Sequence, residues 1–209
     1  MESAALVTAF VTLFVIIDPI GLLPIFISLT QGVPTRERRA IAMRACIIAA
    51  VLLSVFAFLG EAVLGFVGIS MPAFRIAGGL LLFFTAFDML FERRTKRREG
   101  QAEEAEEEPD HDDPSVFPMA LPLIAGPGAI TTVILLVGQY DDTQSKLLML
   151  AMALAVVLLL FVLFLTADFF ERALGRTGIN VVTRLFGMLL AALAVQFILD
   201  GLRDVGLLG

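Results

Sequence analysis

The chain has 209 residues, 58% of them hydrophobic, and a mean hydropathy of +0.92. These values exclude a typical soluble domain and indicate an integral membrane protein. The net charge of −6 reflects mainly a dense acidic run at residues 103–113, so it does not describe the whole surface, and we expect no nucleic-acid partner.

The chain offers few residues for metal binding or catalysis. Its single cysteine, Cys46, lies in an apolar run, and its single histidine, His111, lies in the acidic run. A disulfide framework and a cysteine-based metal site are therefore excluded. Ser-His-Asp, Cys-His and His-rich patterns are absent from the apolar segments, so we expect neither an enzyme nor a bound metal or cofactor.

Six apolar segments are long enough to cross a membrane, which requires about 20 residues each. They cover residues 4–31, 41–67, 72–91, 116–139, 146–169 and 181–202. The sequence therefore predicts an all-α membrane protein with six transmembrane helices. It divides into a first three-helix repeat (1–91), a charged linker (92–115) and a second three-helix repeat (116–209).

The first and fourth segments each contain a stretch that interrupts a helix. These stretches are Asp18-Pro19-Ile20-Gly21 and Gly126-Pro127-Gly128-Ala129. Proline lacks a backbone donor and clashes with the preceding turn, so helices 1 and 4 should be broken at mid-membrane depth. Such a break strands polar backbone groups, which is tolerated only where protein or a wet cavity satisfies them.

The two halves resemble each other in register. Pro19 lies 56 residues before Arg75, and Pro127 lies 57 residues before Arg184. The pattern Arg-x-x-Gly-x-Leu-Leu begins at both arginines. Because each half has an odd number of spans, the repeats must be inverted relative to one another, as in many secondary transporters.

The linker at 92–115 is the only long polar connection. It opens with Arg93-Arg94-Thr95-Lys96-Arg97-Arg98 and continues into the acidic run. It has few apolar residues to bury, so we expect it to be disordered, with its basic cluster near anionic lipid headgroups. The alternative is a specific site for a partner.

Lysine and arginine residues gather in the connections after spans one, three and five. The positive-inside rule places these connections in the cytoplasm. Both termini should therefore be periplasmic.

The two interruptions predict a binding site. Half-helices that begin at Pro19 and Pro127 would present free N–H groups and a positive dipole end to a substrate carboxylate. Asp18 would bind an ammonium group or a coupling cation; the alternative is that it only caps its helix. The other candidate residues allow close approach or supply hydroxyls, and they are Gly21, Gly126, Gly128, Thr131 and Thr132. Together they suit a small zwitterion such as an amino acid.

Two acid–base combinations flank the turns of the predicted hairpins. They are Glu61 with Arg75 and Asp168 with Arg184. As functional pairs they would gate opposite faces of the membrane. The alternative is a pair of static ion pairs or interfacial anchors.

Three stretches resemble the MarC family of integral membrane proteins, also called UPF0056 or NAAT. They are residues 14–26 (FVIIDPIGLLPIF), 75–79 (RIAGG) and 117–130 (FPMALPLIAGPGAI). The resemblance covers nearly the whole chain. It implies a six-span bacterial inner-membrane protein related to LysE-type exporters. It also implies transport of small neutral amino acids such as glycine and alanine, as in members of the SnatA type.

Two other functions are weighed against amino-acid transport. One is efflux of drugs or stress metabolites, although the candidate site residues are small and polar rather than aromatic. The other is a non-transporting membrane assembly factor, in which the interrupted helices serve only packing. Left open are the amino acid, the coupling ion (H⁺ or Na⁺), the direction of transport, the oligomeric state and the role of the acidic run.

Overall fold

The computed structural model describes residues 3–107 and 113–207, and within these ranges every regular element is a helix. The elements are α1 (Ser3–Ile17), α2 (Pro19–Leu29), α3 (Thr35–Val67), α4 (Met71–Leu90), α5 (Arg93–Glu107), η1 (Ser115–Ile124), α6 (Pro127–Val137), α7 (Thr143–Leu165) and α8 (Ala167–Asp204). Five helices are long and apolar enough to span a membrane when α1 and α2 count as one, and the bent pair η1–α6 makes up to six. The predicted all-helical class is confirmed.

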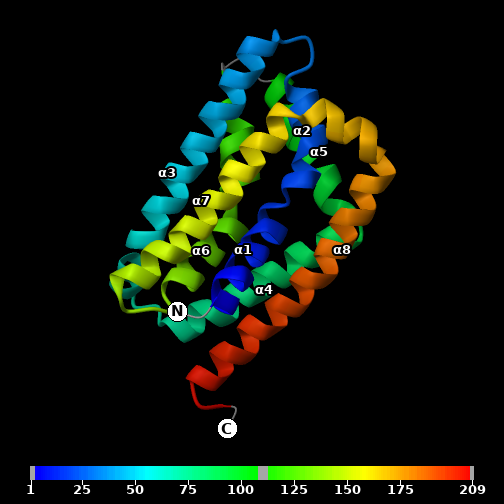
Figure 1. Cartoon of the computed structure of the whole chain (residues 1–209). Coiled ribbons are helices and arrows are strands. Elements are labelled where there is room, and N and C mark those ends of the chain that lie inside the picture. Colours follow the sequence, from blue (N-terminus) through cyan, green and yellow to red (C-terminus); the bar gives the residue numbers. More distant parts are fainter. Residues whose placement is uncertain (1–2, 108–112, 208–209) are drawn as a thin grey trace.

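The segment formed by α1 and α2 is the centre of the molecule (Figure 1). Its apolar window is 67% buried, whereas the windows of α3, α4 and α8 are each 28% buried. Small and aliphatic side chains allow this enclosure, since Ala9, Leu13 and Leu22 are all fully buried. The first span is therefore a core helix surrounded by the others.

Two antiparallel helix pairs pack around this centre. Glu61, near the end of α3, pairs with Lys146 at the start of α7, and Arg38, near the start of α3, pairs with Asp168 just beyond the end of α7. In the second pair, α4 approaches α8 so closely that a Cβ at Gly79 would lie 2.8 Å from the carbonyl oxygen of α8 residue 194. Glycine permits this contact, as is usual between membrane helices.

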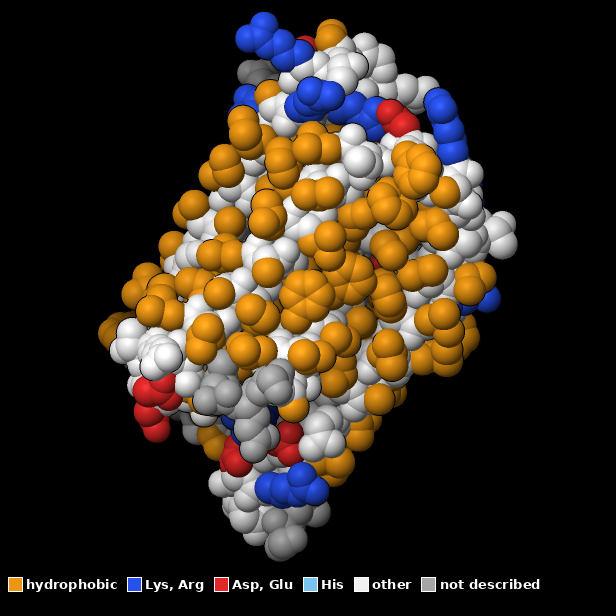
Figure 2. Space-filling model, viewed as in Figure 1, with side chains coloured by type: hydrophobic (Ala, Val, Ile, Leu, Met, Phe, Trp, Pro, Cys, Tyr) orange, Lys and Arg blue, Asp and Glu red, His pale blue; other side chains and the backbone are white. Residues whose placement is uncertain are grey.

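The outer surface has the pattern of a membrane protein. Apolar side chains cover the middle band, and charged side chains gather toward the two ends (Figure 2). Several large hydrophobic residues point outward, including Phe66, which is 93% exposed, and Leu158, which is 64% exposed. Exposure of this kind is explained when the surrounding solvent is lipid.

The structure differs from the sequence prediction in the linker. Residues 93–107 form α5 rather than a disordered chain, and α5 packs against α2, α4 and η1. Residues 108–112 of the predicted linker lie outside the described residues. Arg94 and Arg98 are buried, so they do not lie at a lipid surface as expected. The helix is held by polar contacts inside the protein, which composition alone does not reveal.

Two span boundaries also differ. The fourth segment consists of η1, with extended dihedral angles at Phe117 and Leu121, followed after a 55° bend by α6. The sixth segment was predicted to begin at 181, whereas its helix begins directly after Gly175, where a kink divides α8 into two helices. Gly175 has φ of 60°, a left-handed value that glycine adopts easily, so the chain can turn there.

Candidate functional site

The first helix interruption lies at Asp18, between α1 and α2. Asp18 has a left-handed backbone (φ 57°, ψ 61°), and its Oδ1 accepts a hydrogen bond of 3.1 Å from the N–H of Gly21. Pro19 follows as the first residue of α2, where its missing donor costs nothing. Only glycine fits at position 21, because a Cβ there would lie 2.1 Å from Oδ2 of Asp18. Asp18 thus acts as the N-cap of α2.

Two arginines from α5 satisfy the remaining polar groups of this interruption. Arg98 Nη1 lies 2.9 Å from Asp18 Oδ2, and Arg98 Nη2 donates to the carbonyl oxygen of Ile17 at 3.2 Å. Arg94 Nη2 donates to the carbonyl oxygen of Ile16 at 2.6 Å. The last carbonyls of α1 lack helical partners, so the two guanidinium groups replace the hydrogen bonds that the break removes.

Burial of these two arginines sets their electrostatics. The pKa of Arg94 is lowered to about 9, first by burial and then by the neighbouring charge of Arg98. The pKa of Arg98 is also lowered by burial, while the charge of Asp18 and its hydrogen bond to Arg98 act in the opposite direction. The side chains of Asp18 and Arg98 are 1% and 6% exposed, so this is a buried ion pair.

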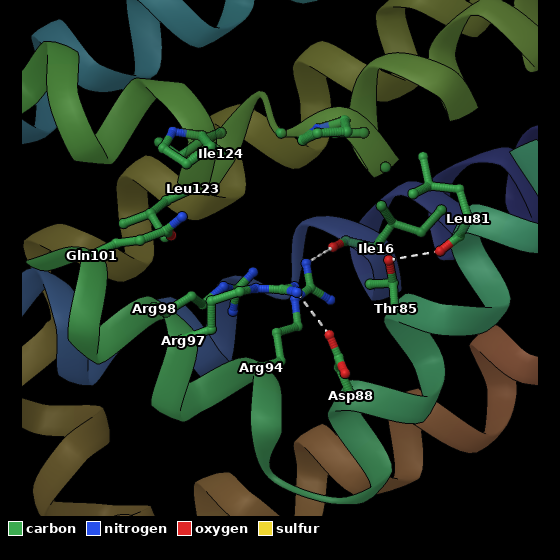
Figure 3. Close-up of a pocket in the computed structure, with 15 residues that line it drawn as sticks. Ile16, Leu81, Thr85, Asp88, Arg94, Arg97, Arg98, Gln101, Leu123 and Ile124 are labelled. Carbon is green, nitrogen blue, oxygen red and sulfur yellow. Dashed lines mark hydrogen bonds and ion pairs between the residues drawn. The ribbon is translucent and has the colours of Figure 1, made fainter.

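A cavity of about 280 Å³ lies beside the two arginines, between α4, α5 and the η1–α6 bend. In Figure 3 the arginine side chains of α5 extend toward α1 and α4, and the hydroxyl of Thr85 donates to the carbonyl oxygen of Leu81. The lining residues come from five elements: Ile16, Leu81, Thr85, Asp88, Arg94, Arg97, Arg98, Gln101, Pro122, Leu123, Ile124, Gly126, Pro127, Gly128 and Ala129.

The wall of this cavity carries charges of both signs. Arg97 Nη1 lies 2.8 Å from Asp88 Oδ2, and these two side chains are 57% and 22% exposed, so the pair lies nearer the surface than Arg94 and Arg98. The start of α6 is also in the wall and has no side-chain cap. The first N–H groups of α6 thus add a partial positive charge. The cavity wall thus has groups suited to an anion and one carboxylate, which pairs with Arg97.

Comparisons with known proteins identify the family. The family model for "MarC family integral membrane protein" matches residues 3–205. The chain belongs to the MarC family. A UPF0056 membrane protein of Archaeoglobus fulgidus is 42% identical over 94% of this chain and 91% of its own length.

Other relatives of this MarC family protein come from distant sources. A UPF0056 membrane protein of Aquifex aeolicus is 39% identical, over 95% of this chain and 92% of its own length. The UPF0056 inner membrane protein YhgN of Escherichia coli K12 is 37% identical, over 95% and 96%. No solved structure matches the chain. The family and the helices together establish an integral, multi-pass membrane protein.

The structure brings together only some of the predicted site residues of the MarC family protein. Gly126, Pro127 and Gly128 line the cavity, as a site at the second interruption requires. Asp18, Pro19 and Gly21 are buried beside it but do not line it.

The two predicted threonines also point elsewhere. Thr132 donates to the carbonyl oxygen of Gly128 at 2.8 Å, and the methyl group of Thr131 packs against Gly78 on α4. Neither of these threonines is a cavity residue. Both contribute to the packing of α6.

The predicted pairing of Glu61 with Arg75 and of Asp168 with Arg184 is wrong in the structure. Glu61 pairs with Lys146, Asp168 with Arg38, Arg75 with Asp204 and Arg184 with Glu92. The reason is the packing: α3 pairs with α7 and α4 with α8, so each charged residue meets the end of a helix in the other half. Three of these pairs lie near helix ends, whereas Arg184 lies inside α8 and pairs with Glu92 just beyond α4.

Sequence reasoning missed the α5 residues at this site. Arg94 and Arg98 are four residues apart and therefore project from one face of a helix. That spacing, together with an unpaired aspartate at a predicted break, was the available signal. Asp88, near the end of α4, also lies in the cavity wall.

Proposed function

We propose that this protein is a secondary transporter of small neutral amino acids, similar in size to glycine or alanine, that works by alternating access. The observation that carries the proposal is the charged wall of the cavity. Guanidinium groups and the start of α6 suit a carboxylate, and Asp88 suits an ammonium group. A small amino acid carries both a carboxylate and an ammonium group, and the two lie close enough together to fit in one small cavity.

The size of the cavity supports a small substrate. Its volume of about 280 Å³ lies just below the roughly 300–1,000 Å³ of pockets for drug-sized ligands. The three arginines in its wall do not favour bulky apolar cargo, so drug efflux is the weaker alternative.

The arrangement of the helices supports two inverted repeats. The half-helices α2 and α6 both begin with proline and both have 11 residues. The equivalent helices α3 and α7 are antiparallel, and so are α4 and α8, as an in-plane two-fold axis requires. Both interruptions then fall at mid-membrane depth. The basic connections face the cytoplasm, and both termini are periplasmic.

One observation favours a non-transporting role instead. The polar groups at Asp18 are satisfied inside the protein by Gly21, Arg94 and Arg98, as a static packing device would need. The second interruption, at Gly126, has no such side-chain cap and opens to the cavity. Transport is therefore the function that accounts for both interruptions.

Transport is tested with purified protein in proteoliposomes. Labelled glycine, alanine and serine are followed in uptake and efflux, with imposed H⁺ or Na⁺ gradients. We expect movement of at least one amino acid, and Asp88→Asn should weaken it about 10- to 150-fold, the effect of losing one charge-assisted hydrogen bond. Lys146→Gln is the matched control, because it removes a charge far from the cavity. Liposomes that move none of these amino acids in any gradient would refute the proposal.

A further inference from the structure

A second set of hollows lies on the outer face of the protein, between α3 and α7. The largest, of about 620 Å³, is bordered by Arg36, Arg39, Met43, Phe161 and other residues. It continues into an apolar hollow of about 220 Å³, because Met43 and Phe161 also line the latter. Toward the chain turn before α3 it adjoins a small polar cavity of about 80 Å³. The three neighbouring hollows, which share wall residues, are here called the α3–α7 groove.

We propose that the α3–α7 groove binds one anionic phospholipid, with its phosphate among the arginines at the start of α3 and an acyl chain in the apolar hollow. This site is separate from the cavity beside Arg94 and Arg98, and it does not depend on the transport proposal.

The basic end of the groove has donors to spare. Arg38 Nη1 donates to Asp168 Oδ1 at 2.9 Å, and its guanidinium lies over the Phe26 ring, but its Nε and Nη2 are buried and have no hydrogen-bond partner among the described residues. Arg36 and Arg39 are exposed and form no ion pair with any described residue. Asp168 lies in the same polar cavity, and Arg38 balances its charge. The charged residues that line the largest hollow and the small polar cavity, Arg36, Arg38, Arg39 and Asp168, therefore carry a net charge of about +2, which favours an anionic headgroup over a zwitterionic one.

The apolar end has the shape and length of an acyl chain. Cys46 and Ala50 are small residues on α3, and they leave the hollow that Leu154 and Leu158 of α7 complete. From Arg39 to Ala50 the helix rises about 16 Å at 1.5 Å per residue. One leaflet of the hydrocarbon core is about 15 Å thick, half of the roughly 30 Å total. A lipid with its headgroup at the arginines would therefore reach Ala50 with the end of its chain.

The groove differs from ordinary lipid-facing surface in two ways. Its apolar end is a hollow between α3 and α7, and its basic end contains buried guanidinium donors that lack a hydrogen-bond partner among the described residues. A buried donor without a hydrogen-bond partner destabilises a protein, and a phosphate oxygen at this position would accept from it.

Native mass spectrometry of the detergent-purified full chain tests the proposal. Phosphatidylglycerol and phosphatidylcholine with identical acyl chains are titrated separately. We expect one tightly retained phosphatidylglycerol per chain, and Arg36→Gln/Arg39→Gln should weaken it roughly 30-fold, about fivefold for each arginine. Lys146→Gln/Arg203→Gln removes two charges at the opposite end and should retain the lipid.

A further variant tests the contribution of the lipid's acyl chain separately from that of its headgroup. Ala50→Phe fills the apolar hollow and leaves every arginine in place, so it should also release the lipid while thermal stability shows that the protein stays folded. Equal retention of both lipids would overturn the proposal, and so would retention by Arg36→Gln/Arg39→Gln. Competition by inorganic phosphate or glycerol 3-phosphate as strong as that of the whole lipid would show an anion site without a chain site, and would also overturn it.

Discussion

The buried ion pair between Asp18 and Arg98 allows a quantitative prediction. Asp18→Asn keeps the N-cap of α2, because asparagine caps about as well as aspartate, but it leaves the Arg98 guanidinium buried without its counter-ion. Removing one partner of a buried pair costs about 3–5 kcal/mol. The two side chains are 1% and 6% exposed and 2.9 Å apart, so little solvent screening reduces this cost. For a chain of this length the loss lowers Tm by roughly 6–20 °C.

Thermal unfolding of the purified protein in detergent measures this effect. Asp88→Asn is the matched control, because its partner Arg97 is 57% exposed and such pairs contribute about 0–1 kcal/mol. We expect Asp18→Asn to lower Tm strongly and Asp88→Asn to change it little.

A double-mutant cycle then isolates the pair. Arg98→Met alone leaves the Asp18 carboxylate buried with only the Gly21 N–H as its donor. Asp18→Asn/Arg98→Met removes both charges, so its loss should be smaller than the sum of the two single losses. Two outcomes would contradict this reasoning: additive losses of stability in the two single variants, or an unchanged Tm in Asp18→Asn. Either would show that the ion pair does not stabilise the α1–α2 interruption.

Three more predictions follow from the packing and the topology. Gly79→Val should destabilise the protein, because its side chain would meet the backbone of α8 at residue 194, and Tm should fall more than for Gly65→Ala, whose added Cβ has nothing within 4 Å. A periplasmic reporter fused after Gly209 should be active; activity of a cytoplasmic reporter instead would reverse the proposed orientation. An experimental structure should superpose residues 1–91 on 116–209 about an in-plane two-fold axis; parallel or unrelated halves would contradict the inverted repeat.

The apolar spans and the positions at which proline disturbs a helix were predictable, because both depend on local properties. A run of about 20 apolar residues is recognisable without tertiary information. Proline after Asp18 and after Gly126 removes a backbone donor wherever the chain lies. The structure accordingly ends α1 at Ile17 and begins α6 at Pro127. The same local reasoning offered the cap at Asp18, but only as the alternative to a binding role.

The contents of the site were less predictable, because they depend on which elements meet. Rules for disorder consider how much apolar surface a segment can bury, and α5 has little. Polar contacts hold α5 instead. Arg94 binds a backbone carbonyl that lacks a helical partner because α1 is interrupted, and Arg98 binds the carboxylate of Asp18 at the interruption. The predicted ion pairs were wrong for a related reason. Pairing Glu61 with Arg75 assumed that neighbours along the chain are neighbours in space.

The polar groups at the two interruptions have different surroundings, and this difference is relevant to the transport proposal. At Asp18 the polar groups are bound by side chains of the protein itself, whereas at Gly126 the start of α6 faces a cavity. Both sets of partners involve α5, which contacts α2 and α4 of the first half and η1 of the second. If the halves move relative to one another, α5 must either follow the first half through the Arg98–Asp18 pair or release it. Because a buried pair is costly to break, we expect α5 to move with α1 and α2, so that Arg97 and the start of α6 approach and separate as the cavity closes and opens.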